Sequence, residues 1–337
     1  MRAIATILVC ATALTLPVTA LAGGSERTGT AGAMELIIPT DARGAAMGGS
    51  VIADADGAEA LFWNPAGAAL IEGSELLASH REYIADINLD HLAFVYNAGS
   101  FGVIGLSVKA LTTGDEPVYT TDHPDGTGEM FSSSFVVVGA SYARAVTDQV
   151  TFGLTGNFIN ERIYRESANG IAFDMGFVYR PSLRNMTFGV VVKNYGPKMK
   201  FDGPDFDTPT DIGQNDQNDP HNARTQSASF ELPSFIQFGV AWDPFQNERH
   251  RVRVTGAFQS NNFSEDEFRF GSEWAMSDQF FVRGGYSASS QDQYMHGFSV
   301  GAGLMLPFGS TNTSIDYTWA EAGVFDSNHF FTLKLRF

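Results

Sequence analysis

The chain has 337 residues, a formal net charge of −17 and a single cysteine, Cys10. The charge argues against nucleic-acid binding, which relies on lysine and arginine to neutralise phosphates, and one cysteine excludes an internal disulfide framework. The mean hydropathy of −0.07 suits a soluble protein, but a transmembrane barrel that alternates apolar and polar residues averages to the same value.

Residues 1–22 are typical of a secretory signal peptide. Arg2 supplies the positive start, residues 3–20 form the apolar core, and Ala20-Leu21-Ala22 is a small-residue cleavage site. A signal-anchor helix is the alternative, and the polar GGSERTGT that follows argues against it. No later apolar run approaches the roughly 18–20 residues that a transmembrane helix needs, so a membrane-spanning chain would have to be a closed barrel.

From residue 74 onward the apolar residues recur with a period of two, interrupted by turn residues, which is typical of β-strands. Most segments approach the length that crosses a bilayer when tilted. We therefore predict an all-β fold, a transmembrane antiparallel β-barrel of fourteen strands over residues 74–337. The fourteen segments are 74–81, 90–98, 101–111, 131–145, 148–162, 169–180, 186–195, 231–243, 250–261, 267–276, 279–289, 296–306, 312–320 and 328–337.

The two faces of these segments differ in polarity. In segment 267–276 the apolar face carries Phe268, Phe270 and Trp274, and the polar face carries Arg269, Gly271 and Glu273. One face suits lipid and the other a polar lumen. A soluble secreted β-sandwich also alternates, with its apolar face inside, and is retained as a third alternative.

The lengths of the connections favour a barrel. With both termini placed on the periplasmic side, the periplasmic turns are short, and the two long connections, 112–130 and 196–230, both lie outside. Outer-membrane barrels have short periplasmic turns and longer outer loops. We therefore predict a location in the bacterial outer membrane, in contact with its lipids.

The final residues, FFTLKLRF, form an alternating strand that ends in an aromatic residue. Phe331, Leu333, Leu335 and Phe337 share its apolar face. Such an ending resembles the signal read by the barrel-insertion machinery of outer membranes, which we expect to be one partner. The alternative is a buried final strand of a soluble protein.

Residues 37–70 carry a run of small residues, an acidic-alanine stretch and the sequence FWNPAG. This block resembles the N-terminal signature of the PorV/PorQ family, whose members are related to the FadL long-chain fatty acid transporters. The resemblance implies that residues 23–73 fold as a plug, or hatch, inside the barrel. The motif residues are Met47, Gly48, Gly49, Trp63, Asn64, Pro65, Ala66 and Gly67. Asn64 and Pro65 are expected to end the plug and redirect the chain into the first strand.

A plug also suits the physics, because fourteen strands enclose more space than their own side chains fill. We hypothesise that acidic plug residues face basic positions on the polar side of the strands, near the periplasmic end. The acidic set is Asp54, Asp56 and Glu59, and the basic set is Arg251, Arg253, Arg283, Lys334 and Arg336. The alternative is that these charges are solvated or paired between strands.

Catalytic and metal signals are weak. GFSVG at 297–301 matches a nucleophile motif around Ser299, with His296 nearby, but that motif requires a strained strand-to-helix turn and here lies inside a strand. The seven histidines lack zinc-binding spacing. The acidic stretch 202–220 invites calcium, yet lacks the order of a calcium loop. We predict no enzyme activity, no metal site and no cofactor.

Two functions remain open at this point. The family resemblance implies a role in type IX protein secretion, in which loops 112–130 and 196–230 bind secretion proteins or cargo. The FadL kinship implies passive transport of a hydrophobic small molecule, with Met47, Phe62 and Trp63 lining an apolar pocket near the plug.

Overall fold

The computed structural model describes residues 27–337 apart from 86, 183–184, 211–220 and 291–296. Among these residues, no helix is long and apolar enough to cross a membrane.

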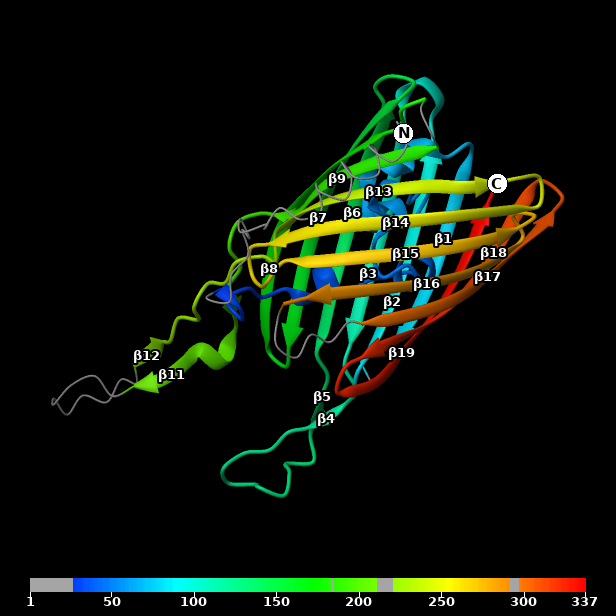
Figure 1. The fold of residues 1–337 in the computed structure, drawn as a ribbon. Helices are drawn as coiled ribbons and strands as arrows, with labels where there is room; N and C mark the ends of the chain where they lie inside the picture. Colours follow the sequence, from blue (N-terminus) through cyan, green and yellow to red (C-terminus); the bar gives the residue numbers. More distant parts are fainter. Residues whose placement is uncertain (1–26, 86, 183–184, 211–220, 291–296) are drawn as a thin grey trace, which may run out of the picture.

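Fourteen long strands of the described chain form a closed antiparallel barrel, as the sequence predicts (Figure 1). Consecutive strands pair with each other, and the first strand closes the ring by pairing with the last, with Glu75 opposite Arg336. The strands are β1 (Ser74–Glu82), β2 (Asn88–Asn97), β3 (Val103–Thr112), β6 (Ser134–Ala145), β7 (Val150–Ile163), β8 (Glu166–Tyr179), β9 (Met186–Tyr195), β13 (Phe235–Gln246), β14 (His250–Asn261), β15 (Glu267–Met276), β16 (Phe280–Ser289), β17 (Phe298–Phe308), β18 (Thr311–Ala322) and β19 (Phe325–Arg336).

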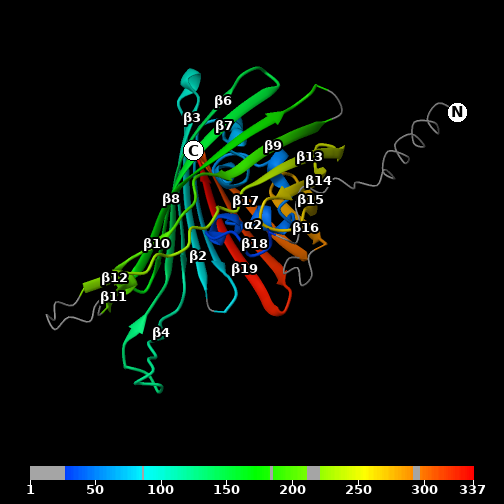
Figure 2. The same ribbon diagram turned by 90° about the vertical axis from the view of Figure 1, so that its left-hand side faces the viewer.

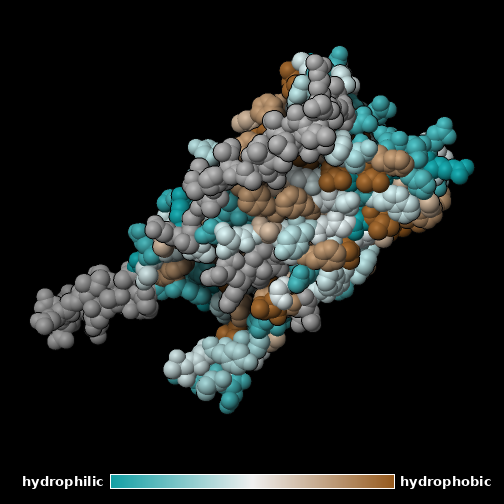
Figure 3. Space-filling model, viewed as in Figure 1, coloured by the Kyte–Doolittle hydropathy of each residue, from teal (hydrophilic) through white to brown (hydrophobic). Residues whose placement is uncertain are grey.

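The barrel wall is apolar outside and polar inside. On β15, Phe268, Phe270 and Trp274 are exposed, whereas Glu273 between them is buried toward the lumen. Figure 3 shows apolar side chains over the wall and hydrophilic ones toward its ends. This polarity is opposite to that of a soluble sandwich, and it is the arrangement that a lipid environment stabilises.

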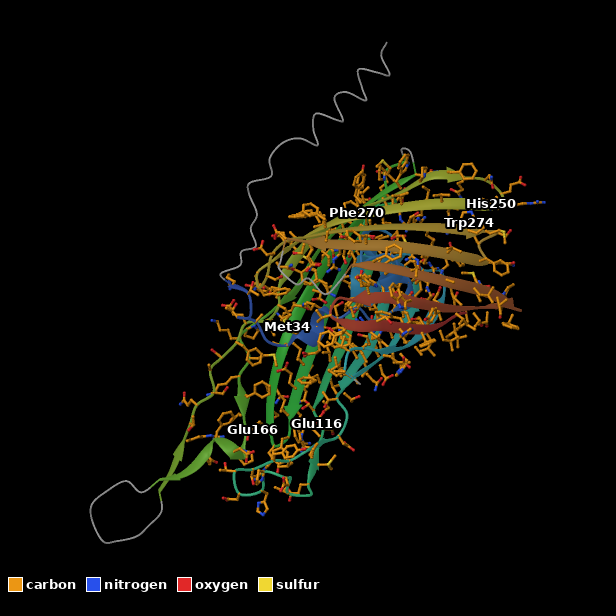
Figure 4. The ribbon with its side chains drawn as sticks, turned by 60° about the horizontal axis from the view of Figure 1, so that its bottom comes forward. Met34, Glu116, Glu166, His250, Phe270 and Trp274 are labelled. Atoms are coloured by element: carbon orange, nitrogen blue, oxygen red, sulfur yellow. The ribbon has the colours of Figure 1, made fainter. Side chains whose placement is uncertain are left out.

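The two ends of the barrel differ. At the inner end, the last residue, Phe337, exchanges backbone hydrogen bonds of 2.8 and 2.9 Å with Ser74. At the opposite, outer end, two hairpins project from the barrel, formed by β4 (Glu116–Pro117) with β5 (Met130–Phe131) and by β11 (Asp207–Thr210) with β12 (His221–Arg224) (Figures 1 and 2). In Figure 4, Glu116 and Glu166 lie toward the outer end, and the stacked pair His250 and Trp274 lies at the other.

The long outer connections are otherwise irregular. The β9–β13 connection contains the short strand β10 (Phe201–Asp202), which pairs with the outer part of β8, and the turn η6 (Pro204–Phe206). By contrast, the inner-end connection between β2 and β3 is a single turn, η5 (Gly99–Phe101). The predicted contrast between short inner turns and long outer loops is therefore present in the described chain.

The segment before β1 fills the lumen as a series of short helical turns (blue in Figures 1 and 2). These are η2 (Met34–Ile37), α2 (Ala42–Ala46), η3 (Val51–Ala53), α3 (Ala60–Trp63) and η4 (Pro65–Leu70). We call residues 31–71 the plug. Its small residues allow the turns to lie directly against the strands.

The plug enters from the outer end, which differs from our placement of both termini on the periplasmic side. Arg27 pairs with Glu231 of the outer β9–β13 connection, and the Gly32 amide donates to the Glu231 carbonyl at 3.0 Å. The chain then descends through the lumen to Ser74 at the inner end. The path of the plug is fixed by backbone contacts with a distant loop. The hydrophobic spacing of the strands therefore carries no information on it.

The C-terminal strand β19 lies in the wall as expected. Phe331, Leu333 and Phe337 are exposed on its outward face, and Thr332 is buried on the inward face. Recognition of this strand by insertion machinery stays a prediction.

Candidate functional site

The candidate site is the contact between the plug and the inner surface of the barrel. Asp41 fixes the start of α2, because its side chain caps this helix by accepting from the Gly44 amide at 2.7 Å. Its second oxygen accepts from Trp63 Nε1 at 2.5 Å, which ties α2 to α3. The plug therefore has an internal polar frame.

Arg43 lies at the centre of this frame, buried and surrounded by acids. Its guanidinium donates to Asp54 and Glu59 at 2.6 Å each and to Glu273 of β15 at 3.3 Å. Burial disfavours its charge, but the acidic neighbours outweigh that effect and raise the pKa of Arg43. Sequence reasoning missed Arg43, although it is the basic residue inside the run of small residues ARGAAMGG.

Three ion pairs then join the acidic plug residues directly to the barrel. Asp54 pairs with Arg253 at 3.1 Å, Glu59 with Lys334 at 3.0 Å, and Asp56 with Arg336 at 3.1 Å. Each acid of the hypothesised set thus lies against a basic residue of the hypothesised set. The three basic residues lie on β14 and β19, near the inner end of the barrel, where the chain passes from the plug into β1.

The pairing of Arg251 and Arg283 differs from the hypothesis, because neither residue contacts an acid of the plug. Both bind Glu273 on the adjacent strand, at 3.3 and 2.8 Å, and Arg283 also binds Asp316 at 2.5 Å. Their link to the plug is indirect, through the bond of Glu273 to Arg43. Cross-strand acids compete for these arginines, and strand periodicity alone does not identify such neighbours.

A cavity of about 290 Å³ lies under the plug, between it and the inner end of the barrel. Most of its lining residues are charged, and Phe281 and Met305 are its apolar residues. The lining includes Arg43, Asp54, Asp56, Glu59, Glu75, Arg251, Arg253, Glu273, Arg283, Asp316, Lys334 and Arg336.

On its outer side the plug is held differently, by cations that donate to backbone carbonyls. Lys109 binds the carbonyl of Ile38 at 3.0 Å, and Lys193 binds that of Phe62. The Phe62 ring lies 4.8 and 4.1 Å from these two ammonium groups, within range of cation–π attraction. The two lysines were not predicted, and only their place on the inward face of β3 and β9 would have marked them.

The Asn64-Pro65 pair connects the plug to β8. The Asn64 amide nitrogen donates to the carbonyls of Ile52 and Phe177 at 2.8 and 3.2 Å, and its oxygen accepts from the Ala66 amide and so caps η4. We expected the motif to end the plug. It does not, because η4 continues to Leu70. It is a joint between α3 and η4.

Replacing Asn64 with aspartate is therefore expected to harm the plug more than replacing it with alanine. Aspartate keeps the cap but turns a buried donor into a charge that faces two carbonyls, whereas alanine only leaves groups unpaired. Each lost buried hydrogen bond costs about 1–3 kcal/mol. Thermal unfolding of the purified barrel checks this order, and greater stability of Asn64→Asp than Asn64→Ala would contradict it.

Glycines of the wall make room for the plug, which sequence reasoning did not anticipate. On eight strands an inward-facing glycine lies where any side chain would meet plug atoms. At Gly153 a Cβ would overlap the backbone of Pro65 and Ala66, and at Gly176 it would overlap Asn64. The full set is Gly105, Gly153, Gly176, Gly189, Gly239, Gly271, Gly285 and Gly301. Glycine at inward positions of successive strands was the available signal.

The apolar motif residues pack instead of lining a cavity. Met47 and Trp63 are buried in one cluster with Leu77, Val95 and Val103 of the wall, with Phe62 partly buried beside it. Gly48 and Gly49 both have a positive φ, and the backbone of Gly48 approaches that of Gly285. These residues hold the plug close to the wall.

The plug's carboxyl groups also predict a pH response. Burial, followed by the nearby charge of Glu59, raises the pKa of Asp41 from 3.8 to about 6. For Glu59, burial opposes ionisation, but Lys334 and Arg43 outweigh it and lower the pKa to about 2. The contribution of Asp41 to the free energy of unfolding is therefore complete below about pH 4 and is lost as the pH rises to about 6. The contribution of Glu59 is complete above about pH 4.5 and is lost as the pH falls toward about 2.

We expect the unfolding temperature of the wild type to fall between about pH 4 and 6, and to fall less for Asp41→Asn, which cannot ionise. Thermal unfolding followed by circular dichroism across this range tests the expectation. Equal falls in the two proteins would show that Asp41 does not titrate there.

The residues of the weak catalytic and metal motifs have structural roles, as far as they belong to the described chain. Ser299 lies within β17 and donates to the Ala46 carbonyl of the plug at 3.1 Å, while His296 lies outside the described residues. In the stretch 202–220, Asp202 and Asp205 pair with arginines, and residues 211–220 lie outside the described residues. No group of three or more metal-binding side chains occurs among the residues that the structure describes.

Comparison with known proteins gives the class of the fold. The model of an uncharacterised protein family, UPF0164, matches residues 12–143, which include the plug. No curated protein matches the chain. The PorV/PorQ assignment is not shown by this match.

Solved structures match almost the whole chain. The toluene transporter TbuX of Ralstonia pickettii has a TM-score of 0.55 at 14% identity, covering 88% of this chain and 98% of its own. The toluene transporter TodX of Pseudomonas putida has 0.54 at 12%, covering 87% and 96%. A FadL homologue of Pseudomonas aeruginosa has 0.51 at 12%, covering 89% and 98%.

The chain therefore has the fold of the FadL-type barrels. At these identities the likeness concerns the fold, and the fold agrees with the outer-membrane location predicted from sequence. The matched structures are transport channels and not enzymes, which is consistent with the absence of a catalytic signal in the sequence.

Proposed function

We propose that this protein is an outer-membrane channel for a hydrophobic small molecule, in which the plug acts as the gate. The observation that carries the proposal is the seating of the plug. It is held in the lumen by hydrogen bonds and ion pairs to the strands, and within the described part of the chain no plug residue belongs to a strand of the barrel sheet.

A buried apolar cluster at the outer end of the plug supports a hydrophobic substrate. Ala33 and Leu36 of the plug pack with Met199 and Leu232 of the β9–β13 connection and with residues of the wall. These residues are buried, so an apolar molecule would reach them only when the plug shifts. Because the cavity on the inner side is charged, passage requires the plug to shift.

The second candidate is a docking platform for secretion proteins, as the PorV/PorQ resemblance implies. The β4–β5 hairpin favours it, because it extends well beyond the barrel (Figure 1) and carries acidic residues that would attract a basic partner. The acids are Asp115, Glu116, Asp122, Asp125 and Glu129.

Transport assays with the purified barrel in liposomes separate the two. The channel proposal expects faster entry of toluene than in protein-free liposomes and no faster entry of a sugar of similar size. Unchanged toluene entry would contradict it. Capture of secretion subunits from the native membrane, lost on deletion of the 116–131 hairpin, would favour the docking role.

A further inference from the structure

The outer end of the plug carries a buried acid that lies apart from the ion pairs of the inner end. Glu35 lies in the turn η2, next to Leu36, and is 5% exposed. Leu36 belongs to a buried apolar cluster with Ile159 of β7 and with residues of the β9–β13 connection. A carboxyl group in such surroundings needs a partner, because burial of an unpaired charge is costly.

That partner is a second carboxyl group. Glu161 lies two residues beyond Ile159 on β7 and is 4% exposed. Its side chain forms a hydrogen bond with the side chain of Glu35, and it also accepts from the Ala33 backbone amide. Two ionised carboxylates cannot form a hydrogen bond with each other, since both are acceptors. One of the two groups must therefore carry a proton.

No basic side chain replaces that proton in the described part of the chain. Lys109 of β3 acts on Glu35 through its charge, but its ammonium group donates to the Ile38 carbonyl at 3.0 Å. Neither Glu35 nor Glu161 is paired with an arginine or a lysine among the described residues. Burial raises the pKa of the Glu35 carboxyl, and the charge of Lys109 offsets this effect only in part.

The two ends of the plug therefore respond to pH in different ways. At the inner end Asp54, Asp56 and Glu59 are paired with basic residues and bind as carboxylates. At the outer end the contact requires a proton, and loss of that proton leaves two buried like charges that repel each other. The contribution of Glu35 to the seating of the plug is complete below about pH 4.5 and is lost as the pH rises through its raised pKa.

We propose that Glu35 and Glu161 form a proton-held latch, which fixes η2 against β7 at low pH and releases it as the pH rises. This assigns a regulation to the gate and rests on the proposed function in that respect, because the release affects transport only if the plug is the gate. The release is local, over residues 33–37, since Gly32 is bonded to the β9–β13 connection and Ile38 to Lys109. The ion pairs keep the inner end seated.

A thiol beside the latch reports the release. The predicted mature chain has no cysteine, so Leu36→Cys places one buried thiol in the purified barrel. Labelling of this thiol by a maleimide is measured from pH 5 to pH 8, with and without Glu35→Gln. The glutamine amide donates to Glu161 without a titrating proton, so the latch stays closed in that variant.

We expect labelling at pH 8 to be at least about ten-fold faster with Glu35 than with Glu35→Gln, and the two rates to converge at pH 5. A single linked proton changes an opening equilibrium by up to about ten-fold for each pH unit. Comparison at one pH removes the titration of the thiol itself and of Asp41, which both proteins share.

Glu161→Gln tests the latch from the wall should Glu35→Gln not fold, and it is expected to slow labelling equally. Glu116→Gln is the matched control, because it removes one exposed carboxyl group from the β4–β5 hairpin and should leave the labelling rate unchanged. Equal labelling at pH 8 with and without Glu35→Gln would overturn the latch. Toluene entry is measured on the same samples, and its absence at pH 8 despite fast labelling would contradict the proposed function and leave the latch in place.

Discussion

Arg43→Gln is expected to unseat the plug and convert a closed barrel into one with frequent large openings. The substitution leaves Asp54, Glu59 and Glu273 close together without their shared cation. Removing one partner of a buried pair costs up to about 3–5 kcal/mol. Here the cost is below that limit, because each acid keeps a second basic partner, Arg253, Lys334 or Arg283. Single-channel recording in planar bilayers measures the openings directly.

Arg165→Gln serves as the control, since it removes an exposed pair with Asp205 that contributes little. It should leave both conductance and thermal stability unchanged. Closed behaviour of Arg43→Gln, equal to that of the wild type, would show that the ion pairs do not hold the plug.

Gly153→Leu is expected to displace the plug by a different route, through overlap and not charge. A side chain at this position of β7 would occupy the space of Pro65 and Ala66. Overpacking of a well-packed interior costs about 1–3 kcal/mol or more, and here the backbone of the plug is the part that must move. We expect higher conductance and a lower unfolding temperature.

Gly156→Leu is a close control on the same strand. Gly156 faces outward, and a Cβ there meets only the Phe173 ring at ordinary contact distance. A leucine on this face enters lipid, so plug and conductance should be unaffected. Equal effects of the two substitutions would place the damage in the strand and not in the plug.

The barrel was predictable because its signal is strong and local. Alternation on each strand, as in Phe268, Glu273 and Trp274, follows directly from a wall with lipid on one side. The aromatic C-terminal strand and the short inner turns agree with it. The ends of the strands differ from prediction by a few residues. Residues near the turns, such as Pro233 and Asn247, can fit or break the alternation of apolar and polar residues by chance.

The plug contacts were predictable only in part. The opposite charges of Asp54 and Arg253 suggested a contact, and complementary charge in one lumen makes that contact favourable. Arg43 and Gly153 were not foreseen, because their roles depend on which plug residue descends to which strand. Arg283 was misjudged because its cross-strand neighbours, Glu273 and Asp316, are closer than any acid of the plug.

If molecules pass only when the plug moves, a reversible tether between plug and wall should stop their passage. Ser50 of the plug and Thr255 of β14 have side-chain oxygens in hydrogen-bond contact at 2.5 Å, so cysteines at these two positions would lie side by side. The native cysteine, Cys10, lies within the predicted signal peptide, so a Ser50→Cys, Thr255→Cys protein should form one defined cross-link.

Toluene entry into liposomes is then measured with the double variant oxidised and after reduction. We expect oxidation to stop entry and reduction to restore it, while the single variants conduct under both conditions. Entry at the same rate with the plug tethered would contradict the gating role and place the path elsewhere in the barrel.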